Sequence, residues 1–232
     1  MYNDKTFLAV IPARGGSKGI PRKNIIKINK KPLIQYTIDA ALSSKYLDDI
    51  IVSTDDKEIA TISRDLGASV PYLRPKHLAT EQSPTIETLI HVIEGQKKLG
   101  RTYDYVVTLQ PTQPLRQARH INEAIEKIIY YNADSLTSVS KVMEHPILMR
   151  TLMKNDQLKN ILNMNSTVRR QDFSEIYKVN GAIYINKTSC MNSETSLNDN
   201  KLAYIMENIY DLDIDEPSDI NLFKWMIENK GV

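Results

Sequence analysis

The sequence predicts an α/β protein with a mainly parallel sheet covered by helices on both faces. Three short apolar runs have the composition of buried strands: 7–11, 49–54 and 105–109. Each precedes a segment whose apolar residues recur at helical spacing: 33–42, 59–66 and 118–131. Ligand sites of such sheets lie beyond the carboxyl ends of the strands, so we expect the functional side chains at that edge.

Local signals indicate where two of the helices begin. Asp55, followed three residues later by Glu58, has the spacing of a capping box for the helix after the second strand. A short strand is expected over 69–72. Ser83 and Pro84 suit the N-cap and the first position of a further helix that runs to about residue 99.

The rhythm of strand and helix changes after residue 135. Strands are expected over 135–142, 177–186 and 202–206, and a closing helix from Pro217. Residues 143–174, which we call the arm, are polar, hold four methionines and lack a long helical pattern. We therefore expect a single domain over 1–232 with an excursion over 143–174 that serves as a dimerisation arm. Methionines that simply fill a core are the alternative.

Composition argues against several classes of protein. The 232 residues suffice for one well-buried domain, and a formal net charge of +2 does not favour nucleic-acid binding. Cys190 is the only cysteine, so a disulfide within the chain is excluded and a reducing cytoplasm is the expected compartment. Because no apolar run approaches 18 residues and no signal-like segment opens the chain, we expect neither a membrane span nor secretion.

Residues 12–24, which we call the glycine-rich loop, follow the first strand and have the composition of a phosphate-binding loop. Three of the chain's eight glycines lie here: Gly15, Gly16 and Gly19. Glycine lets main-chain N–H groups approach a ligand, and Arg14, Lys18 and Lys23 supply charge for phosphate oxygens. The order of residues excludes the P-loop and the dinucleotide fingerprint. A basic surface turn remains the alternative.

Residues 211–215, which we call the carboxylate segment, alternate Asp211, Asp213 and Asp215 with apolar residues. In an extended backbone the three carboxylates share one face, where their repulsion favours a cation between them. Mg²⁺ is commonly held by one or two carboxylates together with substrate phosphates, so this segment could complete a site with the glycine-rich loop. The same acids could instead cap the helix that begins at Pro217.

Six motifs occur in order along nearly the whole chain. They include Arg14-Gly15-Gly16-Ser17-Lys18, Ser53-Thr54-Asp55, Leu73-Arg74-Pro75, Gln110-Pro111-Thr112, Arg169-Arg170-Gln171-Asp172 with Asn180-Gly181-Ala182, and Asp213-Ile214-Asp215. Together they resemble the CMP-sialate synthetase family, cytidylyltransferases that activate sialic acids and related nine-carbon sugar acids. The resemblance implies a three-layer αβα Rossmann-like nucleotidyltransferase fold with a protruding dimerisation arm, and a homodimer.

The resemblance also implies the nucleotide and metal ligands. Phosphates and ribose of CTP would be bound by Arg14, Ser17, Lys18, Lys23 and Asn24. Arg74, Ser83 and Thr85 would face the cytosine, and Gln110 would lie between nucleotide and sugar. Asp213 and Asp215 would bind Mg²⁺.

The sugar side follows from the same resemblance. The residues implied are Gln110, Arg170, Lys178, Asn180 and Tyr184. Arg170 would pair with the carboxylate of the sugar acid, because a guanidinium binds both oxygens. Two departures occur: Glu81-Gln82 replaces the commoner Asp-Thr, and Lys178 stands where many sialate enzymes have arginine. The second leaves the sugar open among sialic, legionaminic and pseudaminic acids.

The expected reaction transfers CMP from CTP to the anomeric hydroxyl of the sugar acid and releases pyrophosphate. Arg14 and Lys18 would hold the phosphates, and either Asp213 or a metal-bound hydroxide would remove the hydroxyl proton. CMP transfer to an eight-carbon acid of the KDO type is the nearest alternative, although the glycine-rich loop fits that family poorly. A nucleotide-binding regulator without catalysis is the alternative from another class.

Overall fold

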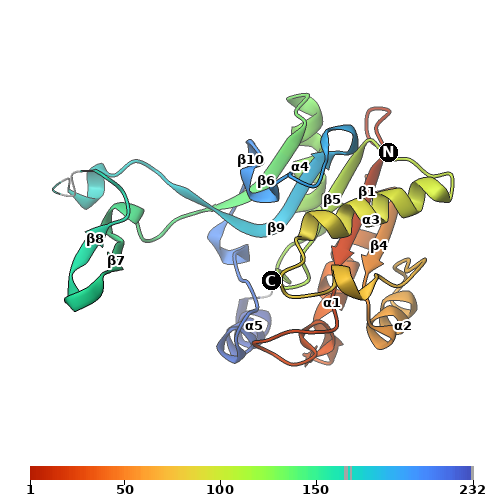
Figure 1. Ribbon diagram of the computed structural model, residues 1–232, viewed down its shortest axis with the longest axis horizontal. Helices are drawn as coiled ribbons and strands as arrows, with labels where there is room; N and C mark the ends of the chain where they lie inside the picture. Colours follow the sequence, from red (N-terminus) through yellow and green to blue (C-terminus); the bar gives the residue numbers. More distant parts are fainter. Residues whose placement is uncertain (165–166, 168, 231–232) are drawn as a thin grey trace.

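A six-stranded sheet forms the centre of the protein, in the order β10-β6-β9-β5-β1-β4 (Figure 1). The computed structural model describes residues 1–164, 167 and 169–230. The strands are β1 (Phe7–Pro12), β4 (Asp49–Ser53), β5 (Tyr105–Thr108), β6 (Ser135–Lys141), β9 (Tyr177–Lys187) and β10 (Leu202–Met206). β1 pairs in parallel with β4 and β5, and β6 with β10, whereas β9 is antiparallel to both its neighbours. The prediction of a mainly parallel sheet is confirmed.

Helices cover both faces of this sheet. They are α1 (Leu33–Leu42), α2 (Lys57–Asp65), α3 (Thr85–Lys98), α4 (Ala118–Tyr130) and α5 (Pro217–Lys230). Because successive residues of a strand point to opposite faces, β1 contributes to two cores. Phe7 and Ile11 pack in the core with α1, α2 and α4, whereas Leu8 and Val10 pack in the core with α3. The three-layer αβα arrangement follows. Within the described residues, no helix is long and apolar enough to span a bilayer.

A third, smaller core lies beneath the glycine-rich loop. Ile20 of the loop joins Leu212 and Ile214 of the carboxylate segment, together with Phe223 of α5. All four side chains are buried, and Ile214 is fully inaccessible. This apolar contact brings residues nearly two hundred positions apart together, and it fixes which side chains of the carboxylate segment remain outside the core.

The arm leaves the body between β6 and β9 and projects well beyond the sheet (Figure 1). It contains two antiparallel strands, β7 (Arg150–Leu152) and β8 (Leu158–Asn160). Met143, Met149 and Met153 are exposed there, so the alternative of methionines as core filler is wrong for this chain. The dimerisation role of the arm stays a prediction.

The start of α2 differs from the prediction by one residue. Asp56, not Asp55, is the N-cap, because its Oδ1 accepts hydrogen bonds of 2.9 Å from the N–H groups of Glu58 and Ile59. Asp55 turns the other way and accepts the N–H of Gly15 at 2.9 Å. The contact with the glycine-rich loop therefore decides which of the two adjacent carboxylates is left to cap the helix.

Two further local predictions were wrong. α3 begins at Thr85 with Pro84 as its N-cap, because the Ser83 hydroxyl is used in a turn, where it donates to the carbonyl of His77 at 2.8 Å. The strand expected over 69–72 is reduced to one bridge between Ser69 and β4. Proline at position 71 lacks the N–H that a longer ladder would need.

Candidate functional site

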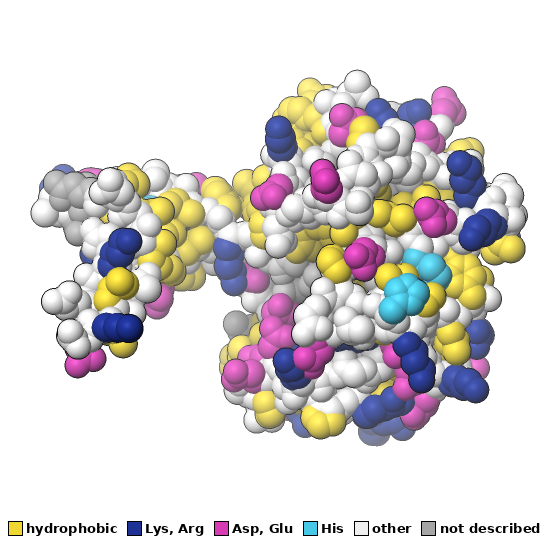
Figure 2. Space-filling view, viewed as in Figure 1, with side chains coloured by type: hydrophobic (Ala, Val, Ile, Leu, Met, Phe, Trp, Pro, Cys, Tyr) yellow, Lys and Arg dark blue, Asp and Glu magenta, His cyan; other side chains and the backbone are white. Residues whose placement is uncertain are grey.

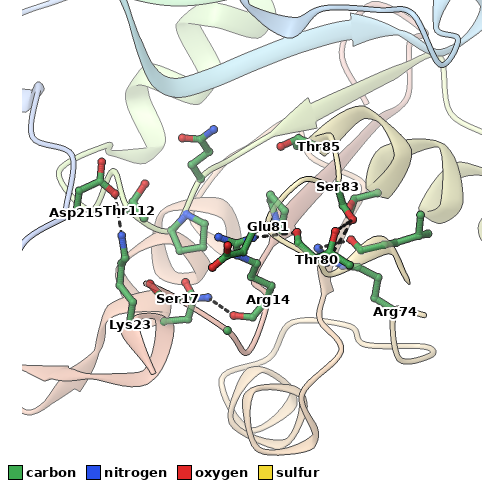
Figure 3. A pocket seen from close by; sticks show the side chains of 17 residues that line it. Arg14, Ser17, Lys23, Arg74, Thr80, Glu81, Ser83, Thr85, Thr112 and Asp215 are labelled. Carbon is green, nitrogen blue, oxygen red and sulfur yellow. Dashed lines mark hydrogen bonds and ion pairs between the residues drawn. The ribbon is translucent and has the colours of Figure 1, made fainter. Parts of the chain in front are cut away.

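A cleft of about 360 Å³ opens at the carboxyl ends of β1 and β5 (Figure 3). Its walls come from the glycine-rich loop, residues 74–88, the loop after β5 and the end of the carboxylate segment. The lining includes every predicted nucleotide-binding residue except Lys18: Arg14, Ser17, Lys23, Asn24, Arg74, Ser83, Thr85 and Gln110. Tertiary structure thus gathers into one cavity residues from four separate stretches of sequence.

Arg74 is a fixed cation in the wall of the cleft. Its guanidinium is buried and donates to the Ser53 hydroxyl at 3.1 Å and to the Ser53 carbonyl, at the end of β4. Burial lowers the pKa of Arg74 to about 10, so the group stays protonated at neutral pH. A buried guanidinium held by strand carbonyls is oriented before any ligand arrives.

The acidic groups at the start of α2 hold the glycine-rich loop. Asp55 accepts the N–H of Gly15, and Arg22 forms ion pairs with Asp56 and Glu58. A Cβ at Gly15 would lie 2.9 Å from the Cβ of Asp56, so this glycine permits the close approach of loop and helix. The expectation that its N–H faces a ligand is wrong, because that N–H already donates to a carboxylate.

Two cations of the loop reach across the cleft to the facing segment. Arg14 donates to the carbonyl of Thr80 at 2.9 Å (Figure 3), and Lys18 forms an ion pair of 2.6 Å with Glu81. The Lys18 side chain is 78% exposed, so its pairing contributes little to stability and is easily exchanged. An anion entering the cleft would compete with Glu81 for this ammonium. Thr80 and Glu81 had no predicted role at this site, because only the folded chain brings them opposite the loop.

The carboxylate segment closes the opposite end of the cleft. Leu212 and Ile214 are buried, whereas Asp213 and Asp215 are exposed, and the Ile214 N–H donates to the Thr112 carbonyl at 2.8 Å. Asp215 accepts a hydrogen bond of 2.8 Å from Lys23, so a loop cation already lies at the carboxylates (Figure 3). Asp211 is set apart from the pair in an ion pair with Lys178 at 3.0 Å. Two carboxylates, not three, therefore remain for a metal.

The donor set of Asp213 and Asp215 fits a hard divalent cation. Although its side chain keeps contact with solvent, partial desolvation raises the pKa of Asp213, and the nearby charge of Asp215 raises it further. A cation would relieve that repulsion. In the part of the chain that the structure describes, no group of three or more His, Cys, Asp or Glu residues could hold a metal. Mg²⁺ bound here would need further oxygen ligands from a substrate or from water.

A second, smaller pocket of about 230 Å³ shares Thr85 and Gln110 with the cleft. Tyr184 lines it and donates to Asn198 at 3.1 Å. Burial raises the pKa of the Tyr184 hydroxyl above its usual value, so it stays protonated and can donate. The contribution of residues 195–198 could not be foreseen, because that loop carries no motif. We call this cavity the side pocket.

Among the other predicted sugar-binding residues, neither Asn180 nor Lys178 lines the side pocket. Asn180 is buried inside the sheet. Its side-chain amide accepts a hydrogen bond from the Ser138 hydroxyl and donates one to the Ser140 hydroxyl. Lys178 is more than half exposed and pairs with Asp211. Arg170 begins a short 3-10 turn in the arm, but its side chain lies outside the described part of the structure. Contacts of these three residues with a sugar stay predictions.

A family model described as cytidylyltransferase matches residues 8–230 of this chain. The chain belongs to the cytidylyltransferase family. It is 36% identical over 224 residues to the CMP-N,N'-diacetyllegionaminic acid synthase of Legionella pneumophila, a match that covers 96% of both proteins. It is 32% identical over 219 residues to the pseudaminic acid cytidylyltransferase of Campylobacter jejuni, with 94% of each chain covered.

A third relative is longer than this chain. The N-acylneuraminate cytidylyltransferase of Streptococcus agalactiae is 35% identical over 215 residues, which cover 91% of this chain and 51% of the relative. The chain therefore spans about half the length of that protein. Among solved structures, a CMP:2-keto-3-deoxy-manno-octonic acid synthetase complexed with CTP matches 97% of this chain and 99% of its own. At a TM-score of 0.74 and 16% identity, that match shows a shared fold alone.

The pairing of Arg22 with Asp56 generates a pH-dependent prediction. Hydrogen bonding to Arg22 lowers the pKa of Asp56, so the pair stabilises the fold above about pH 4 and loses that effect as pH falls through the lowered value. Asp56→Asn should reduce the free energy of unfolding by about 1 kcal/mol at pH 7. The difference from the unmodified protein should shrink toward pH 3 in urea unfolding.

Asp65→Asn is the matched control, because Asp65 is exposed near the end of the same helix. It should change stability by less than about 0.5 kcal/mol at every pH. A difference for Asp56→Asn that stays constant from pH 7 to pH 3 would show that the ion pair does not stabilise the loop.

Proposed function

We propose that this chain transfers CMP from CTP to the anomeric hydroxyl of a nonulosonic acid and releases pyrophosphate. The observation that carries the proposal is the cleft itself, where a cation-bearing glycine-rich loop faces a pair of carboxylates. Membership of the cytidylyltransferase family supports the nucleotide, and the similarity to N-acylneuraminate, legionaminic acid and pseudaminic acid enzymes supports the nine-carbon acid. The single cysteine favours a cytoplasmic compartment.

In this proposal the loop and the facing segment bind CTP from two sides. Arg14, Lys18 and Lys23 would contact the phosphates, exchanging their present partners Thr80, Glu81 and Asp215 for phosphate oxygens. Arg74, already fixed at β4, would face the cytosine together with Ser83 and Thr85. Because Arg74 is held at Ser53 before the ligand binds, its guanidinium needs no reorientation when the nucleotide enters.

Asp213 and Asp215 would hold Mg²⁺ at the end of the cleft nearest Lys23. When bound, this ion neutralises charge on phosphate oxygens as a Lewis acid. The sugar acid would lie against Gln110 and Tyr184 in the side pocket, with its carboxylate paired to Arg170. Its anomeric hydroxyl then attacks the α-phosphorus of CTP, the bond to pyrophosphate breaks, and Asp213 accepts the hydroxyl proton.

Pyrophosphate release provides the direct test. The protein would be assayed with CTP and Mg²⁺ against a panel of sialic, legionaminic, pseudaminic and KDO-type acids. We expect release with at least one nine-carbon acid and little with the eight-carbon acid. Release with the KDO-type acid alone would show that the substrate is the eight-carbon acid and not a nine-carbon acid. Binding of CTP without turnover on any acid would indicate a regulator.

Lys18→Ala tests the phosphate contact. The variant removes a charge that acts on the transition state, so kcat/KM should fall by an amount equivalent to about 2 to 4 kcal/mol. Thermal stability should hardly change, because the ion pair with Glu81 is exposed. Lys27→Ala, an exposed lysine outside the cleft lining, is the control and should retain full activity. A folded Lys18→Ala protein with normal turnover would refute the assignment.

Arg170→Lys tests the sugar carboxylate. Charge is retained, but an ammonium cannot reproduce the planar fork, so kcat/KM for the sugar acid should fall about tenfold or more. CTP affinity, measured by calorimetry without sugar, should stay within about twofold. The neighbouring Arg169→Lys is the control, since Arg169 pairs with Asp172 at 2.8 Å. Equal losses for CTP and sugar would assign Arg170 to the nucleotide site or to the fold.

We also propose that the arm mediates a homodimer. Hydrophobic side chains gather on the side of the arm nearest the body (Figure 2), and Leu152 and Leu158 are both about two-thirds exposed. A hollow of about 640 Å³ at its base, where Met143 and Phe173 lie among polar residues, offers a further contact surface. Such a projecting apolar surface has too little core of its own and suits a second copy.

Sedimentation at micromolar concentration should therefore give about twice the chain mass of 26.5 kDa. Leu158→Asp should shift the protein toward a monomer, because it places a charge on the apolar surface of the arm. Leu222→Asp, on the exposed side of α5, is the matched control and should leave the mass unchanged. A monomeric mass for the unmodified protein would contradict the proposal.

A further inference from the structure

A buried guanidinium lies behind the wall of the cleft, at the end of the loop after β5. The Arg116 residue is 2% exposed and lines neither the cleft nor the side pocket. Across the described residues, no carboxylate forms an ion pair with it. Burial lowers the pKa of Arg116 to about 9, so the group stays charged at neutral pH. A buried charge without a counter-ion is costly for stability, which suggests a role beyond packing.

Arg116 connects three separate elements through hydrogen bonds. Its Nη1 donates to the carbonyls of Gln113 at 3.1 Å, Gln110 at 3.3 Å and Ala182 at 3.3 Å. Its Nη2 donates to the hydroxyl of Thr37 at 2.7 Å. The loop after β5 is thereby attached to β9 on one side and to α1 on the other. A planar fork with several donors can make these bonds together, and an ammonium cannot.

The loop that Arg116 holds carries groups for both ends of the site. The Gln110 side chain lies against Gly181, where an added Cβ would be 2.9 Å from its Oε1. Two residues further on, the Thr112 carbonyl accepts the N–H of Ile214, the residue between Asp213 and Asp215, at 2.8 Å. A shift of this loop would therefore move Gln110 and the carboxylate segment together.

We propose that Arg116 is a positioning residue that aligns Gln110 with the Asp213 and Asp215 carboxylates during nucleotidyl transfer. It touches neither substrate, and it acts through the main chain of residues 110–113. The inference rests on the proposed function, and it adds a specific prediction. Loss of the guanidinium should impair turnover while leaving the CTP contacts of Arg14 and Arg74 intact.

Arg116→Lys is the principal variant. We expect kcat to fall about tenfold or more, while KM for CTP stays within about threefold. Hydrogen–deuterium exchange should become faster at Ile214, whose N–H depends on the Thr112 carbonyl, and remain unchanged in α2. Arg64→Lys is the matched control, because Arg64 also donates to a carbonyl, that of Val70 at 2.7 Å, but lies on α2. It should leave kcat unchanged.

A double-mutant cycle with Gln110→Ala separates positioning from general damage. If Arg116 acts through Gln110, the loss in the double variant should be clearly smaller than the product of the two single losses. Should Arg116→Lys fail to fold, Thr37→Val provides a milder version, since it removes the hydroxyl that accepts from Nη2. Thr37→Val should then also give faster exchange at Ile214 and a lower kcat, each change being smaller than that expected for Arg116→Lys.

The outcomes of this experiment are distinguishable. Multiplicative losses in the cycle, or a folded Arg116→Lys protein with normal kcat and normal exchange at Ile214, would overturn the inference. If the unmodified protein releases no pyrophosphate with any sugar acid, the proposed function fails. The exchange measurement still decides whether Arg116 holds the loop and the carboxylate segment.

Discussion

Acidic side chains hold the segment on which the whole site depends, the glycine-rich loop after β1. Asp55 and Asp56 hold its first and last turns through Gly15 and Arg22, and Asp215 holds Lys23 from the other side. Loops rich in glycine lose much entropy on ordering, so these contacts, together with burial of Ile20, keep the loop in one shape. The cleft exists because both of its walls are tied to this loop.

The same contacts explain how a cation-rich loop can be stable before a ligand binds. Lys18 and its partner Glu81 are both exposed, at 78% and 45%, so phosphate oxygens can replace this weak ion pair at little cost. The Lys23 side chain is only 11% exposed, but its partner Asp215 is 70% exposed. Arg74 and Arg116 differ, because both are buried and bonded to carbonyl groups. The site thus combines exchangeable charges at the surface with fixed guanidinium groups behind it.

Local sequence predicted well wherever one periodicity or one short motif was sufficient. Apolar spacing predicted the strands β1, β4 and β5 and the closing helix at Pro217. The lack of a regular apolar pattern predicted the projecting arm. Local reasoning failed where two neighbouring groups could serve the same purpose. Asp55 and Asp56 are both able to cap α2, and the Ser83 hydroxyl could cap α3 or close a turn. In each case a contact with another segment made the choice.

By itself, the sequence determined the fold class, the cytidylyltransferase motifs and most of the residues that line the cleft. Only tertiary structure decided that Glu81 faces Lys18 and that Asp211 forms an ion pair with Lys178, apart from the other two carboxylates. It also decided that the Asn180 side chain is hydrogen-bonded inside the sheet. The reason is physical. Periodicity and turn chemistry act over a few residues, whereas the partner of a charged or polar side chain depends on which distant strands and loops the hydrophobic cores bring together.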